Sequence, residues 1–294
     1  MLSTLEAAAP VSDAKGTVKV SEAQLQQFEQ DGYVCVRGLF TDTEIAELRD
    51  TFMTMNQAGP VPGLSEMRRI KVGGTDGEYD PADPLAFYPR MLHPHRHSDK
   101  PVGPLSMRYM THPKLAPLLA ALFKEEPLAV QSMFYFKPPG ARGQDLHQDN
   151  FYLKVKPGTC VAAWVAVDDV DEENGGMMCV PNTQSYPIQC PEISDPKLYF
   201  TTEHVEPPAG TKPEYVRMKA GDVLFFNGNV IHGSTPNVST TRFRRSFICH
   251  YVPRSTAEIS HWYTAYTFDG QKIDVRVNQD GGPCGTPREA SAPH

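Results

Sequence analysis

The sequence predicts a mainly β protein, in which a double-stranded β-helix, or jelly-roll barrel, is flanked by helices. From about residue 128 to 253, short runs rich in β-branched and aromatic residues alternate with Gly, Pro, Asn and Asp turns. Helix-like patterns come before these runs. The composition, 40% apolar and 21% charged with 27 prolines, is that of a folded protein with many loops.

The N-terminal part contains two helix starts. Residues 1–18 have no periodicity and are predicted to form a flexible tail. The stretch "SEAQLQQFEQDGY" begins with Ser21 and has Gln24 three residues later, which is a capping-box pattern. "TDTEIAELRDTF" repeats the pattern with Thr41 and Glu44, and the alternating "YVCVRGLF" between the two predicts a strand.

The next segment, residues 55–104, is irregular and rich in Gly and Pro, which indicates a lid or binding loop. Its "HPHRHS" places three histidines next to a proline, and we expect a solvated loop there. "THPKLAPLLAALFKEEP" predicts a short helix that ends near Pro127. One domain over residues 19–294 is expected, with a helical lead-in 19–127, a jelly-roll core 128–253 and a C-terminal extension 254–294.

Charge and targeting signals exclude some functions. The net charge of −7 argues against binding nucleic acid through bulk electrostatics. The N-terminus has no signal-peptide pattern, and no apolar run approaches the roughly 18 residues of a membrane span. A cytoplasmic protein without a membrane partner is expected. The sequence does not indicate an oligomeric state.

The six cysteines form no CxxC pair and no metal-finger spacing. Several lie inside apolar, strand-like runs such as "TCVAAWVAV" and "FICHY". All six are therefore expected to be buried or free thiols in a reducing compartment.

The stretch "GQDLHQDNFY" carries the first candidate for chemistry. If it is extended, His147 and Asp149, two residues apart, face the same side. His232, in the distant "NVIHGSTPN", is the candidate third ligand. Two imidazoles and one carboxylate on one face of an ion form the site of non-haem Fe(II) oxygenases. A short HxD alone is more commonly a loop hydrogen bond.

The segment "HGSTPNVSTTRFRRSFICHY" adds a candidate anion site. Ser234 follows His232 by two residues, and Arg244 and Ser246 lie further along on the next predicted strand. A 2-oxoglutarate that chelates iron needs its far carboxylate bound, and the planar fork of arginine does this. Arg242 or Arg245 could be the anchor instead, and the context "FRRS" favours Arg244.

The chain resembles the phytanoyl-CoA dioxygenase family through "QSMFYFKPPG", "HQD", "AAWVAVDD", "ENGGMMCVPNTQ", "KAGDVLFFNG", "HGSTPN" and "RFRRSFICHY". The resemblance implies Fe(II) ligands at His147, Asp149 and His232. It also implies 2-oxoglutarate anchors at Arg244 and Ser234 and a polar position near the co-substrate at Gln131. Ser246, two residues after Arg244, is the expected hydroxyl donor beside the anchor. The implied reaction uses O2 to hydroxylate an unactivated C–H bond of a small-molecule substrate, with release of succinate and CO2. Since Asp149 supplies a carboxylate, where halogenases have a small residue, hydroxylation is favoured over chlorination.

Two other classes of protein remain open. A cupin-like metal protein that uses Zn or Mn for hydrolysis or isomerisation could keep the three ligands, but it has no need of Arg244 and Ser234. A non-catalytic sensor of iron or 2-oxoglutarate would keep every residue named. Turnover separates a sensor from an enzyme.

Overall fold

The structure, a computed structural model, describes residues 11–12, 18–66, 71–72, 75–76, 90–280 and 282–284. Four helices lie before the main strands: α1 Glu22–Asp31, α2 Asp42–Gln57, α3 Val102–Met110 and α4 Leu115–Phe123. Both predicted capping boxes are confirmed. The backbone N–H of Gln24 donates to Ser21 Oγ at 3.2 Å, and that of Glu44 donates to Thr41 Oγ1 at 3.3 Å.

The larger sheet has eight strands in the order β19-β18-β7-β16-β9-β14-β3, with β6 paired to β7 as the eighth. The strands are β3 Tyr33–Val36, β6 Arg90–Leu92, β7 Pro127–Tyr135, β9 Val161–Ala166, β14 Val223–Asn227, β16 Ser246–Pro253, β18 Ala265–Tyr266 and β19 Lys272–Ile273. Antiparallel pairing in this sheet places strands that are distant in sequence side by side.

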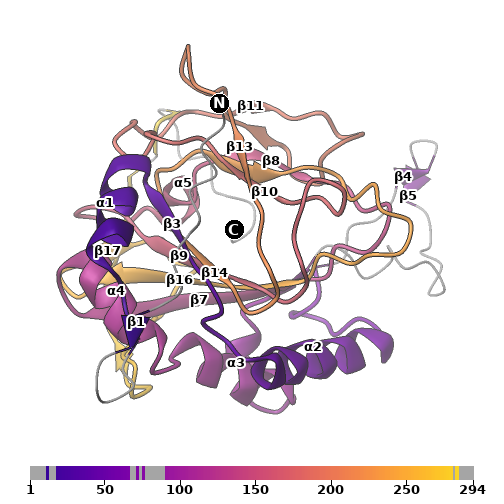
Figure 1. Ribbon diagram of the computed structural model, residues 1–294, viewed down its shortest axis with the longest axis horizontal. Coiled ribbons are helices and arrows are strands. Elements are labelled where there is room, and N and C mark those ends of the chain that lie inside the picture. The colour runs from indigo at the N-terminus through magenta and orange to yellow at the C-terminus, as the bar shows by residue number, and fades with distance from the viewer. Residues whose placement is uncertain are drawn as a thin grey trace.

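A smaller sheet has the order β13-β10-β15-β8. Its strands are β8 Gln144–His147, β10 Met177–Cys179, β13 Glu214–Val216 and β15 His232–Ser234. It lies above the larger sheet in the view of Figure 1. The two sheets form the predicted jelly roll, whose strands β7 to β16 fall within residues 127–253.

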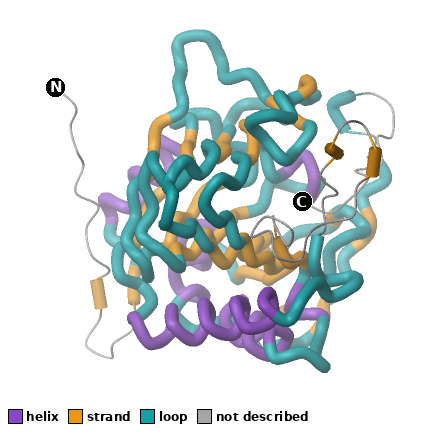
Figure 2. Tube along the Cα trace, turned by 90° about the vertical axis from the view of Figure 1, so that its right-hand side faces the viewer, coloured by secondary structure: helices purple, strands orange, loops and turns teal. Residues whose placement is uncertain are grey.

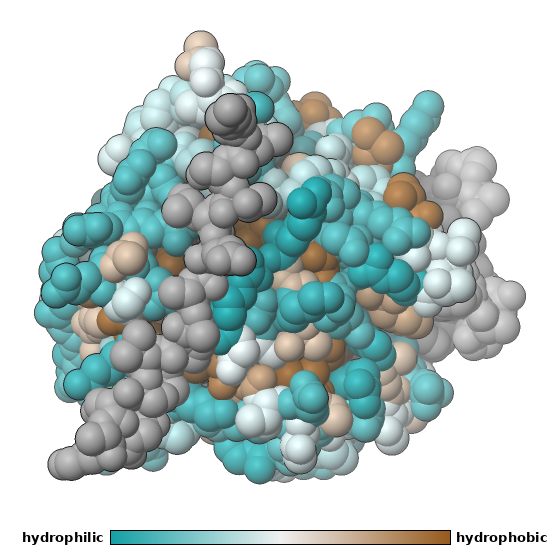
Figure 3. All heavy atoms as spheres, in the orientation of Figure 1, coloured by the Kyte–Doolittle hydropathy of each residue, from teal (hydrophilic) through white to brown (hydrophobic). Residues whose placement is uncertain are grey.

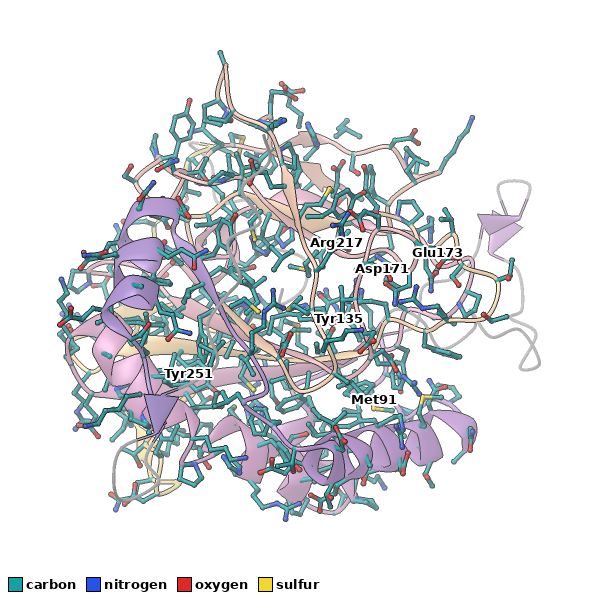
Figure 4. All side chains as sticks on the ribbon, in the orientation of Figure 1. Met91, Tyr135, Asp171, Glu173, Arg217 and Tyr251 are labelled. Carbon is teal, nitrogen blue, oxygen red and sulfur yellow. A yellow bond between two sulfur atoms is a disulfide. The ribbon has the colours of Figure 1, made fainter. Side chains whose placement is uncertain are left out.

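Helices cover the outer face of the larger sheet, as Figure 2 shows for the layer below the strands. Phe52 of α2 stacks on Phe134 of β7 with ring centroids 4.1 Å apart, and the Tyr251 hydroxyl donates to Met110 O at 2.7 Å. The neighbouring Tyr135 belongs to the cluster between the sheets instead. In Figure 4, Tyr135 lies between the sheets, and Met91 lies towards the helices. Strand alternation therefore divides β7 between the core and the barrel interior.

Several short elements complete the described residues. They are α5 Asn150–Leu153, the 3-10 turn Pro94–Arg96, and the strand pairs β1 Val11–Ser12 with β2 Val18–Lys19, β4 Lys71–Val72 with β5 Thr75–Asp76, β11 Glu192–Ile193 with β12 Glu203–His204, and β17 Glu258–Ile259 with β20 Arg276–Val277. The predicted N-terminal tail falls mostly outside the described residues. The face in Figure 3 is mainly hydrophilic, with apolar residues in small separate patches.

The segment predicted to be irregular contains the strand pair β4 and β5, the strand β6, the 3-10 turn and the start of α3, so that prediction is wrong for them. Helix α3 contains Gly103 and Pro104, which read as a turn in sequence. Pro104 lies in the first turn, where the missing N–H is tolerated. A Cβ on Gly103 would lie 2.0 Å from His97 O, so glycine is required by a close backbone approach. Most of residues 67–89 lies outside the described residues.

The predicted solvated histidine loop is also wrong for two of its three histidines. His93 and His95 are 7% and 5% exposed. His95 Nδ1 is 2.7 Å from Ser132 Oγ, whereas neither ring nitrogen of His93 has a hydrogen-bond partner within the described part of the chain. Burial lowers the pKa of His93 to about 2, so its ring is neutral at physiological pH.

The cysteine prediction is wrong for one pair. Cys190 and Cys284 form a disulfide, with Cα atoms 5.1 Å apart. They are 94 residues apart in sequence, so spacing gave no signal of the pairing. The other four cysteines are buried free thiols, as expected. No helix within the described ranges is long and apolar enough to cross a membrane.

We expect Thr41→Ala to lower the free energy of unfolding by about 1 kcal/mol, because it removes the side-chain acceptor that caps α2. Chemical denaturation measures this change. Thr43→Ala, on the exposed face of the same helix, is the matched control and should change stability by less than about 0.5 kcal/mol. Equal effects of the two substitutions would contradict the capping assignment.

Candidate metal centre

The small sheet brings the three predicted ligands together. His147 ends β8 and pairs with His232, the first residue of β15. Asp149 Oδ1 lies 3.6 Å from His147 Nε2 and 3.5 Å from His232 Nε2. One ligand atom from each residue lies within 4.8 Å of the others, and the three residues are at most 4% exposed. Two imidazole nitrogens and one carboxylate oxygen are a donor set that suits Fe(II).

Asp149 reaches this position in a different way from the one predicted. The expected geometry was a continuous strand, but β8 ends at His147 and Asp149 is the helical N-cap residue of α5, with φ −60° and ψ −37°. Its side chain makes no capping hydrogen bond to that helix. The turn after β8 therefore brings the carboxylate to the imidazoles, and the i, i+2 strand argument is wrong in its geometry although the pair does converge.

Hydrogen bonds fix the tautomer of both imidazoles. His147 Nδ1 is 2.7 Å from Asp145 O, and His232 Nδ1 is 2.9 Å from Val230 O. A carbonyl oxygen only accepts, so Nδ1 donates in each ring, and in the neutral ring the lone pair is on Nε2. Burial lowers the pKa of His232 to about 4, which keeps its ring neutral at pH 7.

His250 was not among the residues predicted for the site. It lies on β16, is 1% exposed, and its Nε2 is 2.8 Å from Asp149 Oδ2. This hydrogen bond holds the outer oxygen of the carboxylate, while Oδ1 faces the two candidate ligands. Partners of this kind orient metal-binding side chains in many metalloproteins.

Arg244 lies just before β16 and is 3% exposed. Its Nη2 donates to Ser234 Oγ and its Nη1 donates to Ser246 Oγ, each at 3.2 Å. The guanidinium carbon is 5.3 Å from the ring centroid of Trp164. Two of the other predicted 2-oxoglutarate contacts, Ser234 and Ser246, thus each hydrogen-bond to Arg244, and Trp164 supports the planar face of the arginine.

Lys137 is a further residue of this cluster that sequence reasoning missed. It is fully buried, and its Nζ donates to Ser234 Oγ at 3.0 Å and to Gly175 O at 3.1 Å. Burial, and secondarily Arg244, holds its pKa well below the ordinary value. No carboxylate lies within ion-pair distance of Lys137 among the described residues. A lysine inside the apolar run "MFYFKPPG" was the available signal.

Gly175, which contacts both Lys137 and Arg244, can only be a glycine. Its φ is +78°, and a Cβ would lie 2.5 Å from Lys137 Cε and 2.6 Å from Thr235 O. Its carbonyl accepts from both Lys137 Nζ and Arg244 Nε, each at 3.1 Å. The glycine lets the backbone approach the side chains of Lys137 and Arg244 closely.

The alternative arginines face elsewhere. Arg245 makes a bidentate ion pair with Asp168, with contacts of 2.6 and 2.8 Å. Arg242 lies at the surface with its guanidinium 2.8 Å from Asp171 and 3.0 Å from Glu173. Of the three arginines, only Arg244 enters the cavity.

One cavity contains the site. It is lined by Met133, Tyr135, Gln144, His147, Asp149, Trp164, Met177, Phe226, His232, Gly233, Ser234, Arg244, Ile248 and His250. The candidate ligands and Arg244 therefore share one space. Gln131 is buried on β7 opposite His250 and is not among the lining residues.

His204 of β12 supports the site from outside. Its Nδ1 is 3.1 Å from Asp145 Oδ1 and its Nε2 is 3.2 Å from Glu206 Oε2. Partial burial lowers its pKa, but the two carboxylates outweigh this effect and the pKa is raised above its ordinary value. A group with a raised pKa stabilises the fold when protonated, and this contribution is lost as pH rises through the folded pKa.

We therefore expect His204→Gln to destabilise the protein at about pH 6 and to have little effect at about pH 9. Urea unfolding of both proteins at the two pH values measures the difference. His261→Gln, at an exposed position, should show no such dependence. If His204→Gln lowers the free energy of unfolding by the same amount at both pH values, the protonated ring of His204 does not stabilise the fold.

Comparison with known proteins identifies related sequences and folds. A family model for phytanoyl-CoA dioxygenase (PhyH) matches residues 28–246. Phytanoyl-CoA dioxygenase 1 of Oryza sativa subsp. japonica is 24% identical over 264 residues, which is 82% of this chain and 92% of that protein. The peroxisomal phytanoyl-CoA dioxygenase of Bos taurus is 26% identical over 244 residues, 79% of this chain and 68% of that protein.

Solved structures share the fold. The crystal structure of the epimerase SnoN with Fe3+, alpha ketoglutarate and nogalamycin RO superposes with a TM-score of 0.58 at 24% identity, covering 80% of this chain and 84% of that one. EvdO2 from Micromonospora carbonacea var. aurantiaca, complexed with 2-oxoglutarate, gives a TM-score of 0.54 at 15% identity, covering 86% and 98%. The jelly-roll architecture is common to all three proteins.

Proposed function

Since this chain belongs to the phytanoyl-CoA dioxygenase family, we propose that it is an Fe(II)- and 2-oxoglutarate-dependent dioxygenase that hydroxylates an unactivated C–H bond of a small-molecule substrate. One observation carries the proposal. The cluster of His147, Asp149 and His232 opens into the same cavity as the buried Arg244 and Ser234.

The residues fit both groups. His147, Asp149 and His232 would hold the metal through two neutral imidazoles and a carboxylate. When bound, Fe(II) would catalyse the oxidation of 2-oxoglutarate by O2, which releases succinate and CO2. It would also catalyse the oxidation of the substrate C–H bond. The chain itself supplies positioning, tautomer control and exclusion of water.

The far carboxylate of 2-oxoglutarate would be held by Arg244, with Lys137 and the hydroxyls of Ser234 and Ser246 beside it. Ser234 Oγ accepts from Arg244 and Lys137, so its own proton is directed elsewhere and can be donated to an anion. A buried guanidinium is unfavourable without a counter-ion, and a bound carboxylate would supply one to Arg244. Gln131, beside His250, would be a more distant contributor.

The rival functions are not favoured. A cupin-like hydrolase or isomerase that uses Zn or Mn has no use for Arg244 and Ser234 in the cavity. A non-catalytic sensor would keep the cavity and the ligands but would release no succinate. The small-molecule substrate is not specified by the described residues.

Anaerobic addition of Fe(II) and 2-oxoglutarate, followed by O2 and a panel of metabolites, tests the proposal. Succinate release that depends on Fe(II) and is stimulated by one metabolite class is expected. Binding without succinate release would favour the sensor, and no binding of 2-oxoglutarate would favour the cupin.

The location of the protein in the cell stays a prediction. The cytoplasm is the expected compartment, but the Cys190–Cys284 disulfide counts against a reducing one. Several of the relatives are named as peroxisomal proteins. Partners other than a small molecule, including nucleic acid, are not proposed.

A further inference from the structure

We propose that Gln144 controls the loading of the metal site. Its side-chain amide donates a hydrogen bond to His147 Nε2, the atom that would bind the metal. When a metal binds there, this hydrogen bond breaks and the amide N–H can donate to the co-substrate instead. The inference rests on the proposed function, because it assumes that His147 binds a metal. It concerns a residue that precedes the ligand by three positions and lines the same cavity.

The tautomer of His147 determines the direction of the contact. Its Nδ1 donates to Asp145 O, so Nε2 can only accept while the ring is neutral. Gln144 Nε2 is 3.1 Å from His147 Nε2 and must therefore donate. The atom that would bind the metal already accepts a hydrogen bond.

The other end of the amide is held as well. Gln144 Oε1 accepts from the Tyr135 hydroxyl at 3.1 Å. That hydroxyl in turn accepts from Arg90 Nη1, and Arg90 Nε forms a 2.5 Å ion pair with Glu66. Tyr135 occupies the space between the sheets in Figure 4. The amide orientation is thus fixed by a polar chain that runs from Glu66 to the metal ligand.

One lone pair cannot bind a proton donor and a metal ion together. Metal binding at His147 must break the hydrogen bond from Gln144. The amide therefore makes metal binding less favourable by the free energy of that hydrogen bond. The released N–H remains in the cavity with Arg244 and Ser234, and the backbone N–H of Gln144 already donates to Ser234 Oγ at 3.2 Å. A carboxylate or keto oxygen bound there is the available acceptor.

Replacing Gln144 with leucine, which has a similar volume and no amide, separates the two roles. We expect Gln144→Leu to bind Fe(II) alone about threefold to tenfold more tightly than the wild-type protein. The Fe(II)-loaded variant should bind 2-oxoglutarate more weakly by a similar factor. Anaerobic competition with a chelator measures the first, and titration of the Fe(II)-loaded protein measures the second. General damage to the site would weaken both.

Gln148→Leu is the matched control. Gln148 also adjoins His147, but its amide donates to Asn229 O at 2.8 Å and accepts from the Gln189 N–H at 2.9 Å. This variant should show no gain in Fe(II) affinity. Tyr135→Phe removes the hydroxyl that holds Gln144 Oε1 and should produce a smaller gain of the same sign.

The inference is overturned if Gln144→Leu binds Fe(II) no more tightly than the wild-type protein does. That result would not affect the proposed function. Failure of the wild-type protein to bind Fe(II) would instead remove the proposed function. If Gln144→Leu does not fold, Tyr135→Phe decides by the same criterion, since a gain supports the inference and no gain overturns it.

Discussion

Replacing His147 or His232 with alanine is expected to abolish the weak visible absorption band that forms when Fe(II) and 2-oxoglutarate bind together without O2. Each substitution removes one of the three candidate ligand atoms from a buried cluster in which Asp149 Oδ1 lies about equally far from both imidazoles. Loss of a direct ligand should reduce Fe(II) affinity by more than the roughly tenfold to hundredfold typical of outer partners.

Anaerobic absorbance titration measures the band, and the rise in thermal midpoint on adding Fe(II) measures the affinity independently. His261→Ala, at an exposed position, is the control and should keep both. Retention of the band in both ligand variants would remove the assignment, because no other cluster of three metal-binding side chains is present among the described residues.

Arg244→Lys is expected to raise the apparent KM for 2-oxoglutarate by about tenfold to a hundredfold, with little change in Fe(II) affinity. Lysine keeps the charge but loses the planar fork that contacts Ser234 and Ser246 at once. It also loses the flat face that lies over Trp164. Initial rates over a range of 2-oxoglutarate concentrations measure the change.

Arg242→Lys and Arg245→Lys are the matched controls. Arg242 is paired with surface carboxylates and Arg245 with Asp168, so neither substitution should change KM by more than about twofold. An effect that is largest at Arg245 would move the anchor by one residue. If none of the three substitutions changes the KM for 2-oxoglutarate, the assignment of 2-oxoglutarate as co-substrate is wrong and the cupin alternative is restored.

The elements that the sequence predicted well are those with a local physical signal. Capping boxes at Ser21 and Thr41 marked the helix starts, because the side chain and backbone groups involved lie within one turn. The grouping of His147, Asp149 and His232 followed from a donor set that few other sites need. The preference for Arg244 over Arg242 and Arg245 followed from the local context "FRRS".

Features that depend on contacts between distant segments were missed. His250 meets Asp149, and Lys137 meets Ser234, only through the pairing of strands that are far apart in sequence. Helix α3 formed despite a Gly-Pro pair, since tertiary packing outweighs local turn preference. The turn at Asp149 shows that residues which converge in the fold can be chosen for a geometric reason that the backbone does not follow.

The Cys190–Cys284 disulfide makes residues 190–284 one covalent ring. His232, Arg244 and His250 lie inside this ring, whereas His147 and Asp149 lie outside it. A protease that cuts the chain once within the ring leaves two fragments joined through sulfur. Such a nicked molecule keeps its full mass on a non-reducing gel and separates only after reduction. Limited proteolysis of this protein therefore has to be read on reducing and non-reducing gels side by side.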